Sequence, residues 1–320
     1  MLELTQEVIF RLCDVLDMHP HQVRAPIAVL LVSLICGMVG SMVVGNRMAF
    51  FSDAMAHCAF AGIAFGLVTA LLVGRAADAP LTGWFVPTLM VTFSALVGMG
   101  IAFVRERTSL ANDTVIGVFF AGAIGFGALM LTALRERSRF DPESFIFGNP
   151  WFVTDINILF LLALLVLTIV LLQFRHNDLV FASVNTSLAR SRGISLGPNS
   201  YLFIVLLAMV VNFSIVAVGV LLINGLLIVP AAVASNLARN LRQMFWLTVL
   251  ISTSAGMGGL WISKHLEIPL GEGEPLRPGP SGPILLLCVL AFFLSVTAPA
   301  LYRLVRPRSA GERSEQPSGS

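Results

Sequence analysis

The chain has 320 residues, of which 57% are hydrophobic and only 12% are charged, whereas soluble domains carry about 25% charged residues. A soluble core cannot bury this much apolar surface, so the composition excludes an ordinary globular protein and predicts a protein embedded in a lipid bilayer. The formal net charge of +2 is too small to suggest a nucleic-acid partner.

Residues 1–25 are predicted to form an N-terminal lead-in to the first membrane span. Apolar residues recur at helical spacing from Glu3 to Asp17, which is compatible both with an amphipathic helix on the membrane surface and with a simple connection. Acidic residues interrupt this segment, so we expect no cleavable signal peptide.

A transmembrane domain is predicted over residues 26–304, because apolar stretches of the length that a bilayer requires follow one another there. These stretches are Pro26–Gly45, Asp53–Gly74, Gly83–Val104, Asp113–Leu134, Phe152–Phe174, Tyr201–Ala234, Phe245–Ser263 and Pro283–Tyr302. Pro26 suits the first turn of its helix. The predicted fold class is therefore an all-α polytopic membrane protein with about eight or nine transmembrane helices. Residues 305–320, rich in Ser, Gly, Pro and charge, are expected to be disordered.

The stretch Tyr201–Ala234 is too long for one helix perpendicular to the membrane. A tight hairpin turning near Val218–Gly219 would divide it into two short spans of about 16 residues each, and Pro230 would kink or thin the second. The count of eight or nine spans depends on this division.

Asp53 and His57 lie four residues apart at the start of an apolar segment. On a helix, positions i and i+4 share one face with their Cβ atoms about 6 Å apart, so both side chains can touch one cation. Ionisable residues inside a span are costly and mark ion or substrate paths. Imidazole with carboxylate suits Zn²⁺, Mn²⁺ or Fe²⁺ better than Ca²⁺ or Mg²⁺. A single His is often an interhelical hydrogen-bond donor, but the acid at i−4 favours contact with a metal.

Other polar residues within or beside the spans are interpreted differently. Asp113 opens a helix, where it is either an N-cap or a further metal contact. Asp155 also stands near a helix start and is interpreted as structural. Asn212 and Asn224 are expected to form interhelical hydrogen bonds. Glycine pairs indicate close helix packing, namely Gly37/Gly40 and Gly62/Gly66.

Several enzymatic motifs are missing from the sequence. A P-loop requires G-x-x-x-x-G-K-[ST], and the single lysine, Lys264, has no glycine loop before it. Neither G-x-S-x-G nor H-E-x-x-H occurs. The four cysteines, Cys13, Cys36, Cys58 and Cys288, have no C-x-x-C spacing, so neither a disulfide framework nor a thiolate cluster is expected.

Four ordered blocks together resemble the permease subunit of the zinc/manganese/iron-type metal-ion ABC importer family. They are N-R-M-A-F-F-S-D-A-M-A-H-C-A-F-A-G-I-A-F-G, N-D-T-V-I-G-V-F-F-A-G-A-I-G-F-G, F-I-F-G-N-P and V-G-V-L-L-I-N-G-L-L-I-V-P-A-A-V-A. The resemblance covers roughly residues 26–300. It implies a type II ABC importer-like fold in the bacterial plasma (inner) membrane.

The resemblance also implies a function and a set of partners. The chain would form the path for a divalent cation, zinc, manganese or iron, as a transporter subunit that is not itself an enzyme. Cytoplasmic ABC ATPase subunits would hydrolyse ATP, an extracytoplasmic metal-binding protein would deliver the cation, and a second copy or a paralogue would complete the permease. No permanently bound cofactor is expected.

Particular residues are assigned by the same resemblance. The metal path falls on Asp53 and His57, with Asp113 a weaker match. The ATPase-coupling loop falls on residues 183–198, including Leu188, Ala189 and Gly193. Two departures are Asn185, near which the family usually has an acid, and Asn149, where the family usually has Asp or Ser.

Three alternatives fit the composition. An ion-coupled secondary metal transporter would use the same pair without an ATPase. An ABC permease for an organic metal chelate would share the architecture, but Asp53 and His57 favour free cations. An intramembrane metal enzyme would require a third strong ligand and a general base near His57, which the sequence does not supply.

Overall fold

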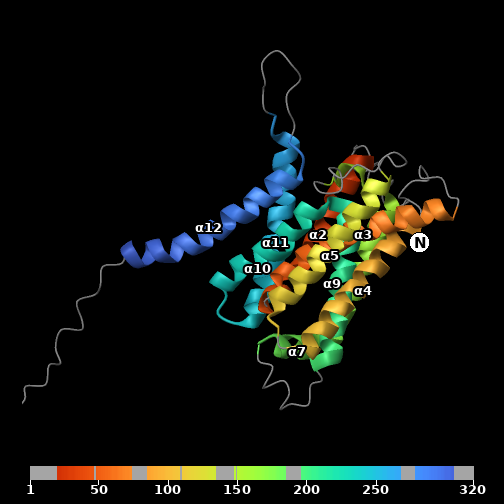
Figure 1. Cartoon of the computed structure of the whole chain (residues 1–320). Coiled ribbons are helices and arrows are strands. Elements are labelled where there is room, and N and C mark those ends of the chain that lie inside the picture. The colour runs from red at the N-terminus through yellow and green to blue at the C-terminus, as the bar shows by residue number, and fades with distance from the viewer. Residues whose placement is uncertain are drawn as a thin grey trace, which may run out of the picture.

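A computed structural model describes residues 20–46, 48–73, 85–108, 110–134, 148, 150–184, 196–267 and 278–305 (Figure 1). Within these ranges all regular secondary structure is helical, without a strand, as the composition predicts. Its elements are α2 (Pro20–Gly45), α3 (Ala49–Leu72), α4 (Phe85–Arg107), α5 (Asn112–Leu134), η1 (a 3₁₀ turn, Pro150–Phe152), α7 (Asp155–Val184), α9 (Leu196–Val218), α10 (Val220–Leu237), α11 (Leu241–His265) and α12 (Ser281–Val305).

Eight helices in this described part, α2 to α11, are long and apolar enough to cross a membrane. The ninth, α12, is apolar over Ser281–Thr297. The prediction of eight or nine transmembrane helices is therefore confirmed. The apolar surface of α5, α7 and α11 is largely uncovered within the chain, as expected for helices that face lipid or another subunit.

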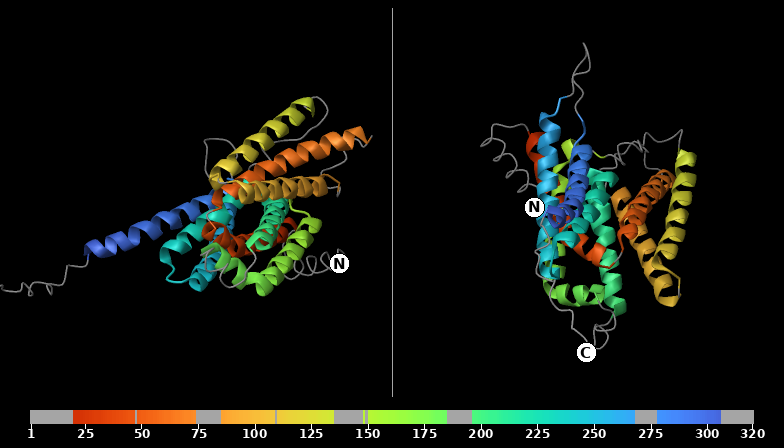
Figure 2. Two further views of the ribbon diagram at one scale, coloured as in Figure 1. Left: turned by 60° about the horizontal axis from the view of Figure 1, so that its bottom comes forward. Right: turned by 90° about the vertical axis from the view of Figure 1, so that its left-hand side faces the viewer.

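The helices form two groups. Helix α3 packs along α4 and α5, whereas α2 packs along α10 and α11, with α12 beside the last two. Helices α7 and α9 connect the groups, because α7 lies on α2 and α9 lies on α4. Figure 2 shows α3, α4 and α5 fanning out from the rest, and the C-terminal part of α12 leaving the bundle. Helix α3 contacts α10 over a small area only.

Close approaches between helices occur at small residues. A Cβ atom added to Gly62 would lie 2.9 Å from Met90 Cα of α4, and one added to Gly37 would lie 2.7 Å from Val249 Cα of α11. Small residues let backbones come this near. The interpretation of the two glycine pairs as helix-packing positions is confirmed, since Gly40 and Gly66 also contact neighbouring helices closely.

The long apolar stretch breaks at Gly219, where the backbone has φ 86°, as predicted. The expected tight hairpin of two short spans is wrong. Helix α9 has 23 residues and α10 has 18, and α10 packs mainly on α2, α11 and α12 rather than along α9. One non-helical residue redirects the chain but supplies too little loop to lay two helices against each other.

The sequence predicts Pro26 in the first turn of its helix, and that prediction is wrong. Helix α2 begins at Pro20, and Pro26 lies inside it. A proline at the first helical position lacks an N–H that would be unpaired anyway, and Pro20 fills that role. Pro26 then removes the hydrogen bond to the carbonyl of Gln22, a loss confined to the second turn.

Gly148 lies against the break between α9 and α10. Its backbone has φ 62°, a region in which residues with a side chain are disfavoured. A Cβ atom there would overlap the carbonyl group of Val218 and the amide of Gly219. Gly148 thus packs directly on the backbone where the two helices part.

Replacing Gly148 with Ala should lower the free energy of unfolding by at least about 2 kcal/mol, because left-handed strain and backbone overlap add together. Thermal unfolding in detergent would measure the loss. Gly282→Ala is the matched control, since Gly282 has open space around its Cα and should lose nothing. Equal unfolding temperatures for the two variants would contradict the packing role of Gly148.

Several sequence-based expectations lie outside the described residues. They are the amphipathic segment from Glu3 to Asp17, the departures at Asn149 and Asn185, the coupling residues Leu188, Ala189 and Gly193, and the tail beyond Val305.

Candidate cation site

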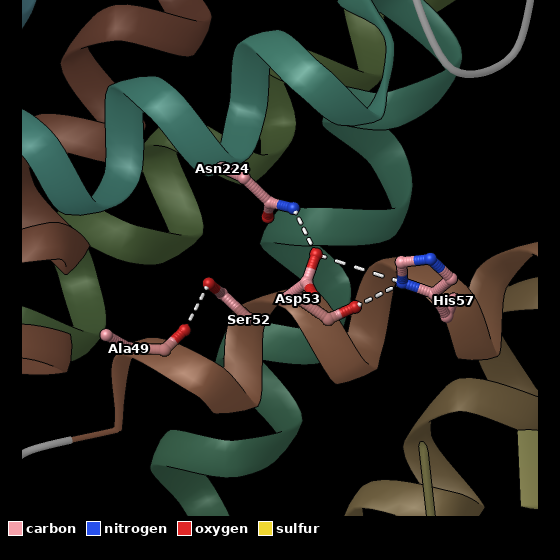
Figure 3. Close-up of polar contacts among 5 residues, drawn as sticks. All are labelled: Ala49, Ser52, Asp53, His57 and Asn224. Carbon is pink, nitrogen blue, oxygen red and sulfur yellow. Dashed lines mark hydrogen bonds and ion pairs between the residues drawn. The ribbon is translucent and has the colours of Figure 1, made fainter. Parts of the chain in front are cut away.

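Asp53 and His57 occupy consecutive turns near the start of α3. The alanine-rich run from Ala49 favours a helix, and Ser52 Oγ donates to Ala49 O at 2.9 Å in its first turn. The Asp53 Oδ1 to His57 Nδ1 distance is 3.8 Å. Figure 3 shows both side chains on one side of the helix, as the i, i+4 spacing requires. About a third of each side chain is exposed, 37% for Asp53 and 36% for His57, so neither side chain is sealed inside the helix bundle.

The imidazole of His57 is oriented by the backbone of its own helix. Its Nδ1 lies 3.0 Å from Asp53 O, and a carbonyl oxygen only accepts, so Nδ1 carries the proton in this contact. In this rotamer only Nε2 is left for a metal, so an ion shared with the Asp53 carboxylate, which lies on the Nδ1 side of the ring, requires the imidazole to turn. The ring also makes an edge-to-face contact with Phe120 from α5, with centroids 4.7 Å apart.

Asn224 of α10 joins this pair, which sequence reasoning missed. Its Nδ2 donates to Asp53 Oδ1 at 2.8 Å (Figure 3). The predicted interhelical hydrogen bond of Asn224 is present, but its partner is the candidate metal ligand itself. The available signal was that Asn224 interrupts an otherwise apolar block.

Asp113 lies apart from the pair. It is exposed in the first turn of α5, where a negative charge interacts favourably with the helix dipole. No group of three His, Cys, Asp or Glu side chains able to hold a metal occurs among the residues that the structure describes. The pair thus offers one carboxylate and one imidazole without a closed ligand cage.

Two further polar contacts have structural roles. Ser94 Oγ of α4 donates to Asn212 Oδ1 at 3.0 Å, which confirms the interhelical role predicted for Asn212. Asp155 accepts from Arg24 Nη2 of α2 at 2.8 Å, and its other oxygen lies 2.6 Å from Arg24 Nε. This two-point ion pair joins α7 to α2 and agrees with the structural interpretation of Asp155.

The described helices make the chain a multi-pass helical membrane protein, and one of them carries a carboxylate–imidazole pair. The chain belongs to the ABC 3 transport family, which matches residues 18–298. The resemblance inferred from the four sequence blocks is confirmed.

The chain is also similar to two curated relatives and to one solved structure. The manganese transport system membrane protein MntC of Halalkalibacterium halodurans is 26% identical over 303 residues, covering 94% of this chain and 96% of that protein. The high-affinity zinc uptake system membrane protein ZnuB of Buchnera aphidicola is 24% identical over 245 residues, covering 76% and 88%. PsaBC from Streptococcus pneumoniae in complex with Fab superposes with a TM-score of 0.70 at 23% identity, covering 90% and 95%.

These similarities confirm the predicted fold, a type II ABC importer-like permease. The chain is a multi-pass protein of the bacterial inner membrane, in a family whose relatives are named for manganese or zinc transport.

Proposed function

We propose that this chain forms the translocation path of an ATP-driven importer of divalent metal ions, manganese or zinc. The observation that carries the proposal is the Asp53–His57 pair, two partly exposed ionisable side chains on one face of an apolar helix. Membership in the ABC 3 transport family and the names of the relatives support it.

The pair would hold the cation only briefly. A transported ion must lose part of its water, yet the ligands must still release it. One carboxylate oxygen and one imidazole nitrogen, supplemented by water, satisfy that requirement better than a closed four-ligand site. Asp113, at the exposed start of α5, would contact the ion elsewhere on its route.

Partner proteins would supply the energy for transport and deliver the metal ion. Separate cytoplasmic ATPase subunits would hydrolyse ATP and act on the loop containing Leu188, Ala189 and Gly193. An extracytoplasmic metal-binding protein would deliver the ion, and a second permease copy or a paralogue would form the other half of the path. Because divalent ions follow the Irving–Williams order at simple sites, we expect the binding protein to set most of the selectivity.

Uptake of radiolabelled manganese and zinc into proteoliposomes tests this function. The vesicles would contain this chain, its candidate ATPase and its binding protein, with and without ATP. Uptake should require both the ATPase and ATP. Metal uptake by the permease alone would contradict the proposed ABC importer and favour an ion-coupled secondary transporter. Uptake of a chelated metal in preference to the free ion would favour a chelate permease.

A further inference from the structure

The hydrogen bond between Asn224 and Asp53 crosses the boundary between the two helix groups. Asp53 stands on α3, beside α4 and α5, and Asn224 stands on α10, beside α2 and α11. Helices α3 and α10 otherwise touch over a small area, and this bond is a polar link between them. The Asn224 amide therefore interacts directly with the charge on the Asp53 carboxylate.

Only one of the two polar atoms of the Asn224 side-chain amide has a hydrogen-bond partner among the described residues. Nδ2 donates to the Asp53 carboxylate at 2.8 Å, while Oδ1 is shielded from solvent and has no hydrogen-bond partner among the described residues. An unpaired, shielded carbonyl oxygen costs about 1–3 kcal/mol. Turning the amide over would exchange the two atoms, because its terminal torsion is broad and roughly two-fold.

The charge that the Asn224 amide meets at Asp53 decides which of the two amide orientations is favoured. Either orientation leaves one amide atom unpaired, so that cost cancels. A bare carboxylate attracts the N–H of Asn224, as observed. A divalent cation on the carboxylate reverses the local charge and attracts the carbonyl oxygen instead.

We propose that Asn224 is a third donor of the transported cation's site, with its amide turning from N–H toward the empty Asp53 carboxylate to C=O toward the bound ion. The inference rests on the proposed function and adds a ligand from the second helix group. In the empty state a hydrogen bond joins α3 to α10, and in the loaded state the cation joins them.

The added donor also bears on which metal is preferred. Amide and carboxylate oxygens are ligands that Mn²⁺ accepts readily, whereas zinc sites use Cys, His, Asp and Glu. A set of one imidazole nitrogen, one carboxylate and one amide oxygen therefore favours Mn²⁺ relative to a site made by Asp53 and His57 alone. Asn224 would thus be a specificity-determining residue within the permease.

Direct binding to the full-length chain in lipid nanodiscs tests the proposal without depending on transport. Mn²⁺ alone would be titrated and followed by the electron paramagnetic resonance signal of the free ion, and Zn²⁺ would be measured by competition. Asn224→Leu removes both amide functions at similar volume and should weaken Mn²⁺ binding about tenfold, the lower end of effects on metal sites. Zn²⁺ binding should change by less than about threefold. Asn224→Asp keeps an acceptor and should bind Mn²⁺ at least as well as the wild type.

The matched control is Asn212→Leu, which removes another interhelical asparagine, one that bonds Ser94 rather than Asp53. Its ratio of Mn²⁺ to Zn²⁺ affinity should equal that of the wild type. Equal loss of both metals in Asn224→Leu, loss of Mn²⁺ binding in Asn224→Asp, or an unchanged Asn224→Leu would each overturn the inference. If these variants bind normally while Asp53→Asn abolishes ATP-driven uptake, the proposed function stands and only the role of Asn224 fails.

Discussion

Combining Asp53→Asn with His57→Ala is expected to reduce ATP-dependent metal uptake at least about 100-fold in the reconstituted transporter, because losing only an outer-shell partner of a metal ligand can already cost that much. The two side chains supply the ionisable ligands on this face of α3, with Asp53 Oδ1 and His57 Nδ1 3.8 Å apart. Asp53→Asn weakens one metal ligand and His57→Ala removes the other. Both positions are partly exposed, so folding should be affected little. Initial uptake rates at equal protein levels provide the measurement.

Asp113→Asn is the comparison for this experiment. Asp113 is exposed in the first turn of α5 and lies apart from the pair, so its substitution should reduce uptake much less. The double variant must still assemble with the ATPase, as judged by co-purification. Normal uptake by the double variant would make His57 a packing residue and would move the search for the ion path to Asp113.

Breaking the ion pair between Arg24 and Asp155 is expected to have the largest effect on stability. The side chains are only 24% and 12% exposed, respectively, and two contacts join them. Removing one partner leaves a mostly buried charge unpaired, which typically costs about 3–5 kcal/mol. Asp155→Leu alone should therefore lower the free energy of unfolding by about that amount, as measured by denaturant titration in mixed micelles.

The double variant Arg24→Leu/Asp155→Leu distinguishes a structural pair from a functional charge. Without an unpaired charge, it should recover most of the lost stability, because apolar replacements of buried pairs are often neutral. Arg242→Leu, at an exposed position early in α11, controls for the loss of an arginine and should be nearly neutral. A double variant as unstable as Asp155→Leu would show that packing, rather than charge pairing, is what the substitution disturbs.

Properties set by short-range sequence were predictable. The spans follow from apolar length, because a bilayer accepts only helices in which every backbone group is paired. The break at Gly219 follows from a glycine in a stretch too long for one span. The shared face of Asp53 and His57 follows from the helical repeat alone, although their role as a cation site stays a prediction.

Contacts between distant residues were decided by the tertiary structure. Asn224 is 171 positions from Asp53, and Arg24 is 131 positions from Asp155. No feature of the sequence shows which helix each would meet, because spans that are apolar on all sides carry little sign of their packing face. For the same reason the sequence suggested a hairpin of α9 and α10, whereas packing lays α10 on α2, α11 and α12. Sequence alone thus determined the helices and the ionisable pair, and only helix packing determined that an amide from the second group completes the pair's surroundings.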